Sequence, residues 1–293
     1  MAFQIQRVVS DGVSLALSRN GAVFAILFFL AESLGVVLVV GVGTTYVPVD
    51  VGTGVAAGGD IAAGGDLPQF TAAVASLLAG GFTSVVTTPI SIVAIRTFVG
   101  GETDGIPDRY LFDRIGRATV SGVAANFLYA ALVFVVTFGI GLALVAAVLG
   151  VGRLDLLPDA VAGPAMLLLA GVGILLAIAL LVTVAVHFLF LLHEISVRHR
   201  GVLGAFRGSW DTVRGNRVRV AALAVLLIAV RSSVSSVAAP PIEAPWTTFH
   251  LLTTPFAMAF AAIVGVVVTA IFARTYRELR SDLPAEFAAA SEE

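Results

Sequence analysis

A histidine followed by a glutamate, His193-Glu194, opens a stretch whose residue types could bind a metal ion. A zinc-dependent membrane protease requires a second histidine four residues later on the same helical face, but Val197 occupies that position. His199 lies about 240° around a helix from His193 and cannot share its ligand face. We therefore interpret His193-Glu194 as a polar pair at the end of a membrane span, with side chains that reach toward the aqueous interface.

Other patterns of catalytic residues are also incomplete. The Gly-x-Ser-Gly pattern of an intramembrane serine protease would require glycine at position 119, where the chain has Thr119 before Ser121. The glycine-rich sequences at 56–60 and 62–66 follow no predicted strand and precede no Lys-Ser or Lys-Thr, so they do not form a phosphate-binding loop. The chain contains no cysteine, which excludes disulfides and thiolate chemistry. We predict that the protein is not an enzyme and has no catalytic residue, metal or cofactor.

Three ionisable residues interrupt long apolar runs and are candidates for a polar cluster inside the membrane. Glu32, Arg231 and His187 lie roughly 20, 18 and 17 Å in from the nearest cytoplasmic arginine, at about 1.5 Å per residue. Because a charge inside a membrane usually faces a partner, Glu32 and Arg231 are predicted to pair, with His187 as a second neighbour. The alternative is that Arg231 extends outward toward Glu243 while Glu32 is protonated.

The elements that carry these residues are predicted to be membrane spans. Of the 293 residues, 58% are hydrophobic and only 12% are charged, far from the composition of a soluble protein. The fold class is all-α, a polytopic bundle of six transmembrane helices that pair into three hairpins, with short interfacial amphipathic helices. The spans are predicted at about 21–43, 70–99, 119–149, 161–192, 220–239 and 246–274.

The loop, the tail and two local features of the helices can also be predicted from the sequence. Residues 44–69 are predicted to form a flexible external loop, and residues 281–293 a solvated tail. Within the second span, Thr87-Thr88-Pro89 is expected to bend or interrupt the helix. A short helix is predicted to begin at Pro107, with Tyr110 facing lipid.

The distribution of arginine sets the predicted orientation. Fifteen of the 17 arginines fall before span one, from the end of span two to the start of span three, between spans four and five, or from the end of span six onward. By the positive-inside rule, both termini are in the cytoplasm and the protein is a multi-pass protein of the cell membrane.

An amphipathic helix is predicted in the basic segment between spans four and five. Val202, Phe206 and Val213 lie on one face, as does Trp210, while most of the arginines point away from it. The residues predicted to contact lipid headgroups are Arg207, Trp210, Arg214 and Arg217.

The same segment carries a resemblance to a known family. Its pattern is an acidic residue, a short turn, Ala-Phe-x-x-Ser-Trp and Arg-Gly-Asn, and a second pattern, ARTYRELR at 273–280, ends span six. Both resemble an uncharacterised six-span membrane protein family abundant in haloarchaea, which is itself similar to the membrane domain fused to some glycerophosphodiester phosphodiesterases. The matching residues of the first pattern are Glu194, Ala205, Phe206, Ser209, Trp210, Arg214, Gly215 and Asn216. The resemblance implies a six-helix bundle without an assigned activity, and the phosphodiesterase barrel has no counterpart in this chain.

These observations predict an integral membrane protein of unknown activity that acts as a scaffold or accessory protein. Its expected partners are membrane lipids and other membrane proteins, and not nucleic acid. Two alternatives stay open: a small-solute or ion transporter, suggested by the proline-containing second span, and a lipid-active membrane enzyme.

Overall fold

The structure, a computed structural model, describes residues 4–46, 67–153, 159–238, 248–280, 282–284 and 287. Within these residues the chain is all-α, as predicted. Its helices are α1 (Ile5–Ala16), α2 (Arg19–Tyr46), α3 (Leu67–Gly100), α4 (Asp108–Phe112), α5 (Ile115–Arg153), α6 (Asp159–His187), α7 (Leu191–Arg198), α8 (Val202–Arg214), α9 (Arg217–Ala238) and α10 (Thr248–Leu279). Most of the predicted external loop, residues 47–66, lies outside the described part of the chain.

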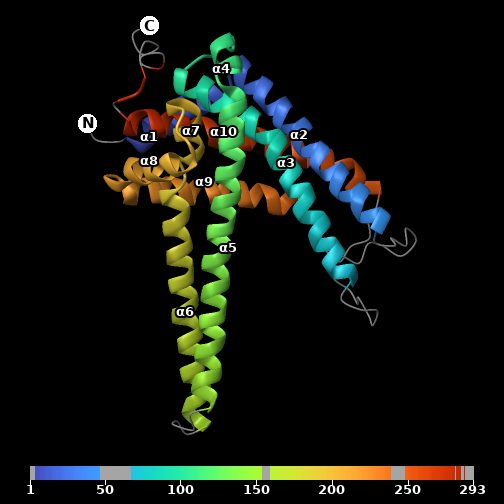
Figure 1. The fold of residues 1–293 in the computed structure, drawn as a ribbon, viewed down its shortest axis with the longest axis vertical. Coiled ribbons are helices and arrows are strands. Elements are labelled where there is room, and N and C mark those ends of the chain that lie inside the picture. Colours follow the sequence, from blue (N-terminus) through green and yellow to red (C-terminus); the bar gives the residue numbers. More distant parts are fainter. Residues whose placement is uncertain are drawn as a thin grey trace.

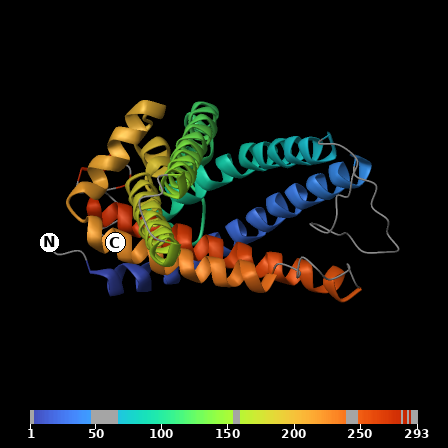
Figure 2. The ribbon, with the colours of Figure 1, turned by 90° about the horizontal axis from the view of Figure 1, so that it is seen from below.

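The long helices pair into three hairpins that begin and end at one side of the molecule, which we call the common end. Helix α2 packs along α3, α5 along α6, and α9 along α10. Away from the common end the hairpins diverge: α5 and α6 extend downward in Figure 1, whereas the other two hairpins extend to the right. Figure 2 shows the same divergence from below, with α5 and α6 seen nearly along their axes. The short helices α1, α4, α7 and α8 surround the common end (Figure 1).

Several long apolar helices indicate a multi-pass membrane protein. Among the described residues, four stretches are long and apolar enough to cross a membrane, and a fifth is counted if α1 and the start of α2, bent by 74° at their junction, form one span. The four stretches are Gly81–Gly100, Ile115–Ala147, Met166–Arg198 and Thr254–Leu279. Helix α9, which corresponds to the predicted span at 220–239, is not one of them, and it carries three arginines in its 22 residues. The described chain therefore shows four or five candidate spans rather than six.

Buried side chains concentrate at the common end. Phe24 of α2 meets Phe98 of α3 edge to face, with ring centroids 5.5 Å apart, and Phe190 contacts Tyr276 of α10 at 5.6 Å. In contrast, the α5–α6 hairpin exposes large apolar side chains along its length, including Phe134 and Leu168. Apolar side chains on the outer surface are what lipid contact requires, so the hairpins are held together mainly where they meet.

Helix α3 is not interrupted at Pro89. Proline removes one backbone donor, yet helical structure continues on both sides of it. The neighbouring hydroxyls bond within the helix: Thr87 Oγ1 donates to the carbonyl of Thr83 at 2.8 Å, and Thr88 Oγ1 donates to that of Ser84 at 2.6 Å. The expected interruption of this span is therefore wrong: the helix continues through Pro89 from Leu67 to Gly100.

Candidate functional site

A buried carboxylate lies at the centre of the common end. Glu194 of α7 is completely inaccessible to solvent. Its Oε1 accepts hydrogen bonds from Arg280 Nη2 at 2.7 Å, Thr212 Oγ1 at 3.1 Å and Tyr276 Oη at 3.1 Å. Its Oε2 forms an ion pair with Arg200 Nη1 at 3.2 Å. We call these five residues the Glu194 network.

The Glu194 network unites the two sequence patterns that carry the family resemblance. Glu194 and Thr212 come from the first pattern and its helix α8, and Tyr276 and Arg280 from the second pattern at the end of α10. The interpretation of Glu194 as a side chain that reaches toward the aqueous interface is therefore wrong. A buried carboxylate is stabilised only where cations and hydrogen-bond donors surround it, and these donors come from 18 to 86 residues away in the chain.

Helix α8 approaches the network at a glycine. The carbonyl of Gly208 accepts a hydrogen bond from Arg280 Nη2 at 3.0 Å. A Cβ atom at Gly208 would collide with the Glu194 carboxylate and the Arg200 guanidinium. Glycine at this position therefore permits the backbone of α8 to lie directly against the buried charges.

The hydroxyl of Ser209 stabilises a break between α6 and α7. It donates to the carbonyl of His187, the last residue of α6, at 2.7 Å, and accepts from the amide of Phe190 at 3.1 Å. These two backbone groups lie where the continuous helix predicted at 161–192 gives way to a turn at 188–190. The serine satisfies both groups, so the regular helix can be interrupted here without leaving them unpaired.

Arg96 of α3 is a second buried charge. In the sequence it contributed only to the arginine count that sets the predicted orientation. Only 1% of its surface is accessible. Its Nε donates to the carbonyl of Ser196 at 2.9 Å, and its Nη1 donates to those of Tyr110 at 3.1 Å and Asp113 at 2.9 Å. Arg96 thus joins α3 to the end of α7 and to the segment around α4. Its position within the apolar end of span two was the feature of the sequence that could have indicated a buried arginine.

The C-terminal segment folds back onto the common end. Arg198 Nη2 donates to Asp282 Oδ2 at 2.8 Å. Burial acts to raise the pKa of Asp282, but this hydrogen bond and the charges of Arg198 and Arg280 outweigh it and hold the pKa below its ordinary value. Within the tail that was predicted to be solvated, Phe287 is buried and stacks on Tyr110 with ring centroids 5.4 Å apart. Tyr110 was expected to face lipid, but this packing encloses it.

The predicted polar cluster is divided between two places. His187 is buried; its Nδ1 lies 2.8 Å from the carbonyl of Thr183, and its ring lies 4.1 Å from that of Trp210. Glu32 is half-buried on α2, and Arg231 is exposed on α9. The ion pairs within 4.0 Å between described residues do not include one from Glu32 to Arg231, although the two groups interact electrostatically. The pairing of Glu32 with Arg231 stays a prediction. His187 contacts Thr183 on its own helix α6 and Trp210 on α8.

The residues predicted to contact lipid headgroups are all exposed and lie on or beside α8. Trp210 is 41% exposed, and the Arg217 guanidinium lies 6.0 Å from its ring. All four are exposed in the structure: Arg207, Trp210, Arg214 and Arg217. This arrangement suits contact with lipid headgroups, which stays a prediction.

The common end offers little that resembles a metal centre. No group of three or more potential metal-binding side chains occurs among the described residues. His193 packs its ring against Phe190 and Tyr276, with centroids 5.4 and 5.3 Å apart. Its neighbour Glu194 is already bonded to Arg280 and the other donors of the network.

Comparison with known proteins gives a family but no activity. Residues 3–279 match the family described as "Domain of unknown function (DUF7847)". The match includes Glu194, Arg200, Thr212 and Tyr276 of the Glu194 network and ends one residue before Arg280. No curated protein and no solved structure matches this chain.

Proposed function

The chain belongs to the DUF7847 family of unknown function, and we propose that it is a non-catalytic scaffold or accessory protein of the cell membrane, with six spans and both termini in the cytoplasm. Membership agrees with the resemblance to an uncharacterised family. The likeness to the membrane domain of phosphodiesterases stays a prediction.

The observation that carries this proposal is the Glu194 network. Its members come from α7, α8, α10, the residue that follows α10 and the connection between α7 and α8, and their polar groups contact Glu194. A carboxylate that is enclosed by four partners and shielded from solvent is suited to holding elements together rather than to exchanging protons with a substrate. This supports a structural role for the most polar part of the interior.

The arrangement of the hairpins supports six crossings. The amide of Asn20, at the start of α2, donates to the carbonyl of Glu102 just after α3, at 2.9 Å. Arg280, just after α10, bonds Glu194, which follows α6. The packing of α9 along α10 then implies that α9 leaves the common end and α10 returns to it. Three hairpins that start and end on one side require an even number of crossings.

The surface of the α5–α6 hairpin supports association with other membrane components. Phe134 and Phe138 stack on each other at 5.7 Å and are both exposed. Leu167 and Leu168 of α6 are 77% and 71% exposed. The continuity of α3 through Pro89 removes one of the reasons for the transporter alternative.

The experiment that tests this function uses a photoreactive amino acid at Phe134 or Leu168 in living cells. A scaffold is expected to give reproducible cross-links to one defined membrane protein, and the abundance of that protein should fall in a deletion strain. Cross-linkers at Ala125, which is buried, serve as the matched control and should not capture it. Solute flux in proteoliposomes of the purified protein, or a changed lipid composition in the deletion strain, would instead support the transporter or the lipid-active enzyme.

A further inference from the structure

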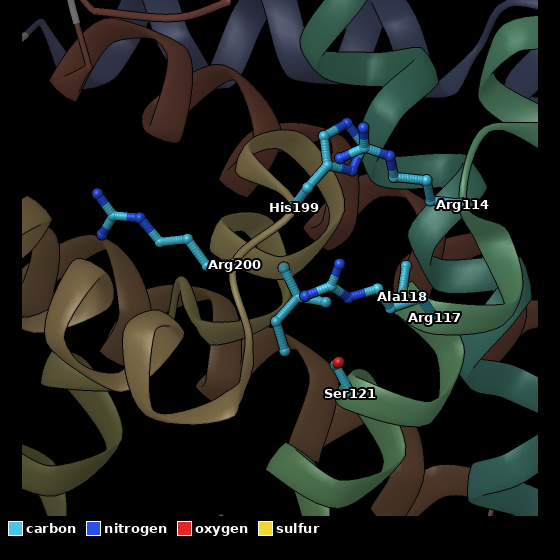
Figure 3. Close-up of a pocket in the computed structure, with 7 residues that line it drawn as sticks. Arg114, Arg117, Ala118, Ser121, His199 and Arg200 are labelled. Carbon is cyan, nitrogen blue, oxygen red and sulfur yellow. The ribbon is translucent and has the colours of Figure 1, made fainter.

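A small pocket at the common end is lined by several cationic side chains. It lies between the first turns of α5 and the connection between α7 and α8. Its enclosed volume is about 10 Å³, and the space reaches about 210 Å³ only when the open solvent at its mouth is included, so a ligand would bind at the mouth. The lining residues, which we call the basic pocket, are Arg114, Arg117, Ala118, Ser121, Ile195, His199 and Arg200. Figure 3 shows the side chains of Arg114, which lies just before α5, and of Arg117 on α5 extending toward the connection, whereas the side chain of Arg200 points away from α5.

The described residues around the basic pocket include more cationic than acidic side chains. Asp113 is the acidic residue in contact with it: its Oδ2 lies 3.4 Å from His199 Nε2, and its Oδ1 lies 3.9 Å from Arg114 Nε. Arg200 is directed to the buried Glu194 instead. Arg117 forms no hydrogen bond or ion pair with any described residue. Among the described residues, one carboxylate therefore faces the guanidinium groups of Arg114 and Arg117 and the imidazole of His199, so the described cationic groups outnumber the described carboxylates.

The helix beside the pocket adds to this positive character. The first turn of α5 contains no acidic residue, and the amide groups at the start of a helix carry a partial positive charge. Arg117 and Ser121 lie four residues apart on α5, so their side chains project from the same face. Ser121 forms no hydrogen bond with any described residue, and it is only partly exposed.

The backbone on both sides of the pocket adopts an unfavourable conformation. Arg114 has φ 49° and His199 has φ 52°, and they are the non-glycine residues with positive φ in the described chain. Such conformations are unfavourable for residues that carry a Cβ atom, and they are often found at binding sites. Both residues line the same pocket, one from each of its walls.

We propose that the basic pocket binds a phosphate group. The pocket offers two guanidinium groups, which bind phosphate oxygens through paired N–H donors, and a hydroxyl that can donate to a third oxygen. Ile195, which is fully buried, forms an apolar wall of the pocket. The phosphate comes from an anionic phospholipid of the cytoplasmic leaflet or from a small soluble phosphate ester. This site is separate from the exposed arginines of α8, and it does not depend on a scaffold role.

Calorimetric titration of the delipidated full-length protein in detergent tests this site. The ligands are short-chain phosphatidylglycerol, glycerol 3-phosphate and short-chain phosphatidylcholine, each added separately. We expect saturable binding of one phosphatidylglycerol per chain. Arg117→Gln should weaken it at least about tenfold, because a hydrogen-bonded charge is lost, and Ser121→Ala should weaken it less. The matched control is Arg219→Gln, which removes an exposed arginine outside the pocket and should leave the affinity unchanged.

The ligands distinguish the two sources of phosphate. Binding of phosphatidylglycerol without glycerol 3-phosphate identifies a lipid headgroup, and equal binding of both identifies a soluble ester. The site is rejected if neither ligand binds saturably, if phosphatidylcholine binds as well with no effect of Arg117→Gln, or if Arg219→Gln weakens binding equally. Arg117 bonds no described residue, so thermal unfolding of its variant should match that of the unmodified protein. If it does not, the comparison is made with Ser121→Ala.

Discussion

Individual buried charges determine how the common end is held together. The Glu194 carboxylate has no access to water, so its negative charge depends on Arg280 and Arg200 for compensation. The two arginines differ in exposure, with 14% of the Arg280 side chain accessible and 34% of that of Arg200. Because screening by water is weaker for the more buried partner, Arg280 should contribute more to stability.

Replacing Arg280 by alanine should therefore destabilise the protein strongly. The variant leaves Glu194 buried with only part of its compensation, and the expected loss is about 3–5 kcal/mol, as measured for broken buried pairs. Thermal unfolding in detergent, followed by the fluorescence of the tryptophans, measures it. Arg219→Ala, at an exposed position, is the control. Equal thermal stability of the two variants would contradict a structural role for the network.

The second prediction for a single residue concerns Arg96. Arg96→Met keeps an unbranched side chain of similar length but removes the donors to the carbonyls of Ser196, Tyr110 and Asp113. Because these acceptors would lose a charged donor, we expect a loss of at least about 2 kcal/mol and faster hydrogen exchange in residues 101–114. Arg109→Met, which removes a half-exposed arginine of α4, should have little effect. Unchanged exchange in the Arg96 variant would reject the proposed link between α3 and α4.

Sequence patterns could indicate these residues but not their partners. Glu194 was recognised as part of a family pattern, and Arg96 could be seen at the apolar end of a span. Their donors and acceptors, however, come from distant segments, as with Arg280, 86 residues from Glu194. The burial of Phe287 beside Tyr110 depends on the same kind of distant contact. The charge of a residue and the periodicity of the apolar residues around it indicate which face of a helix it occupies. Its contacts with distant segments depend on the tertiary fold.

At the scale of helices, apolar length predicted the pairing of spans well, whereas local breaks were harder to place. The prolines suggested a break in α3 that does not occur, and nothing in 161–192 indicated the turn after His187. That turn depends on Ser209, which lies on α8 and not on the helices it joins. A side chain from another helix can stabilise a break in a helix. The sequence of the broken segment alone therefore does not reveal the break.

Two glycines of α8 give a matched test of how closely this helix packs. Gly208→Ala would force a Cβ into the Glu194 carboxylate, and we expect a loss of about 1–3 kcal/mol from overpacking. Gly204→Ala, one turn earlier, places its Cβ 3.6 Å from the nearest atom of Arg200, which is ordinary contact. It should therefore stabilise the helix by about 0.5–1 kcal/mol. Thermal unfolding compares the two variants, and a tolerated Gly208→Ala would refute the close approach of α8 to the network.

For the whole molecule, the divergence of the hairpins has a physical reason in their composition. Helices α5 and α6 are apolar on most of their exposed surface, so no polar face directs either one toward a particular neighbour. The specific polar contacts described here lie mainly at the common end, through Glu194, Arg96 and Asn20. Composition and arginine counts could therefore predict three hairpins with their ends on one side, but not the angles between them.

The last prediction concerns α9, on which the number of crossings depends. Helix α9 is not one of the candidate spans, yet α10 returns to the common end to bond Glu194, so α9 must cross if α10 does. Single cysteines in this cysteine-free chain test this with an impermeant thiol reagent on intact cells. Ala244→Cys, between α9 and α10, and Ala57→Cys, between α2 and α3, should be labelled from outside. Gly201→Cys, exposed at the common end, should be labelled only after the cells are permeabilised, because the proposed orientation places the common end in the cytoplasm. Protection of Ala244→Cys together with labelling of Ala57→Cys would mean that α9 and α10 do not form a crossing hairpin.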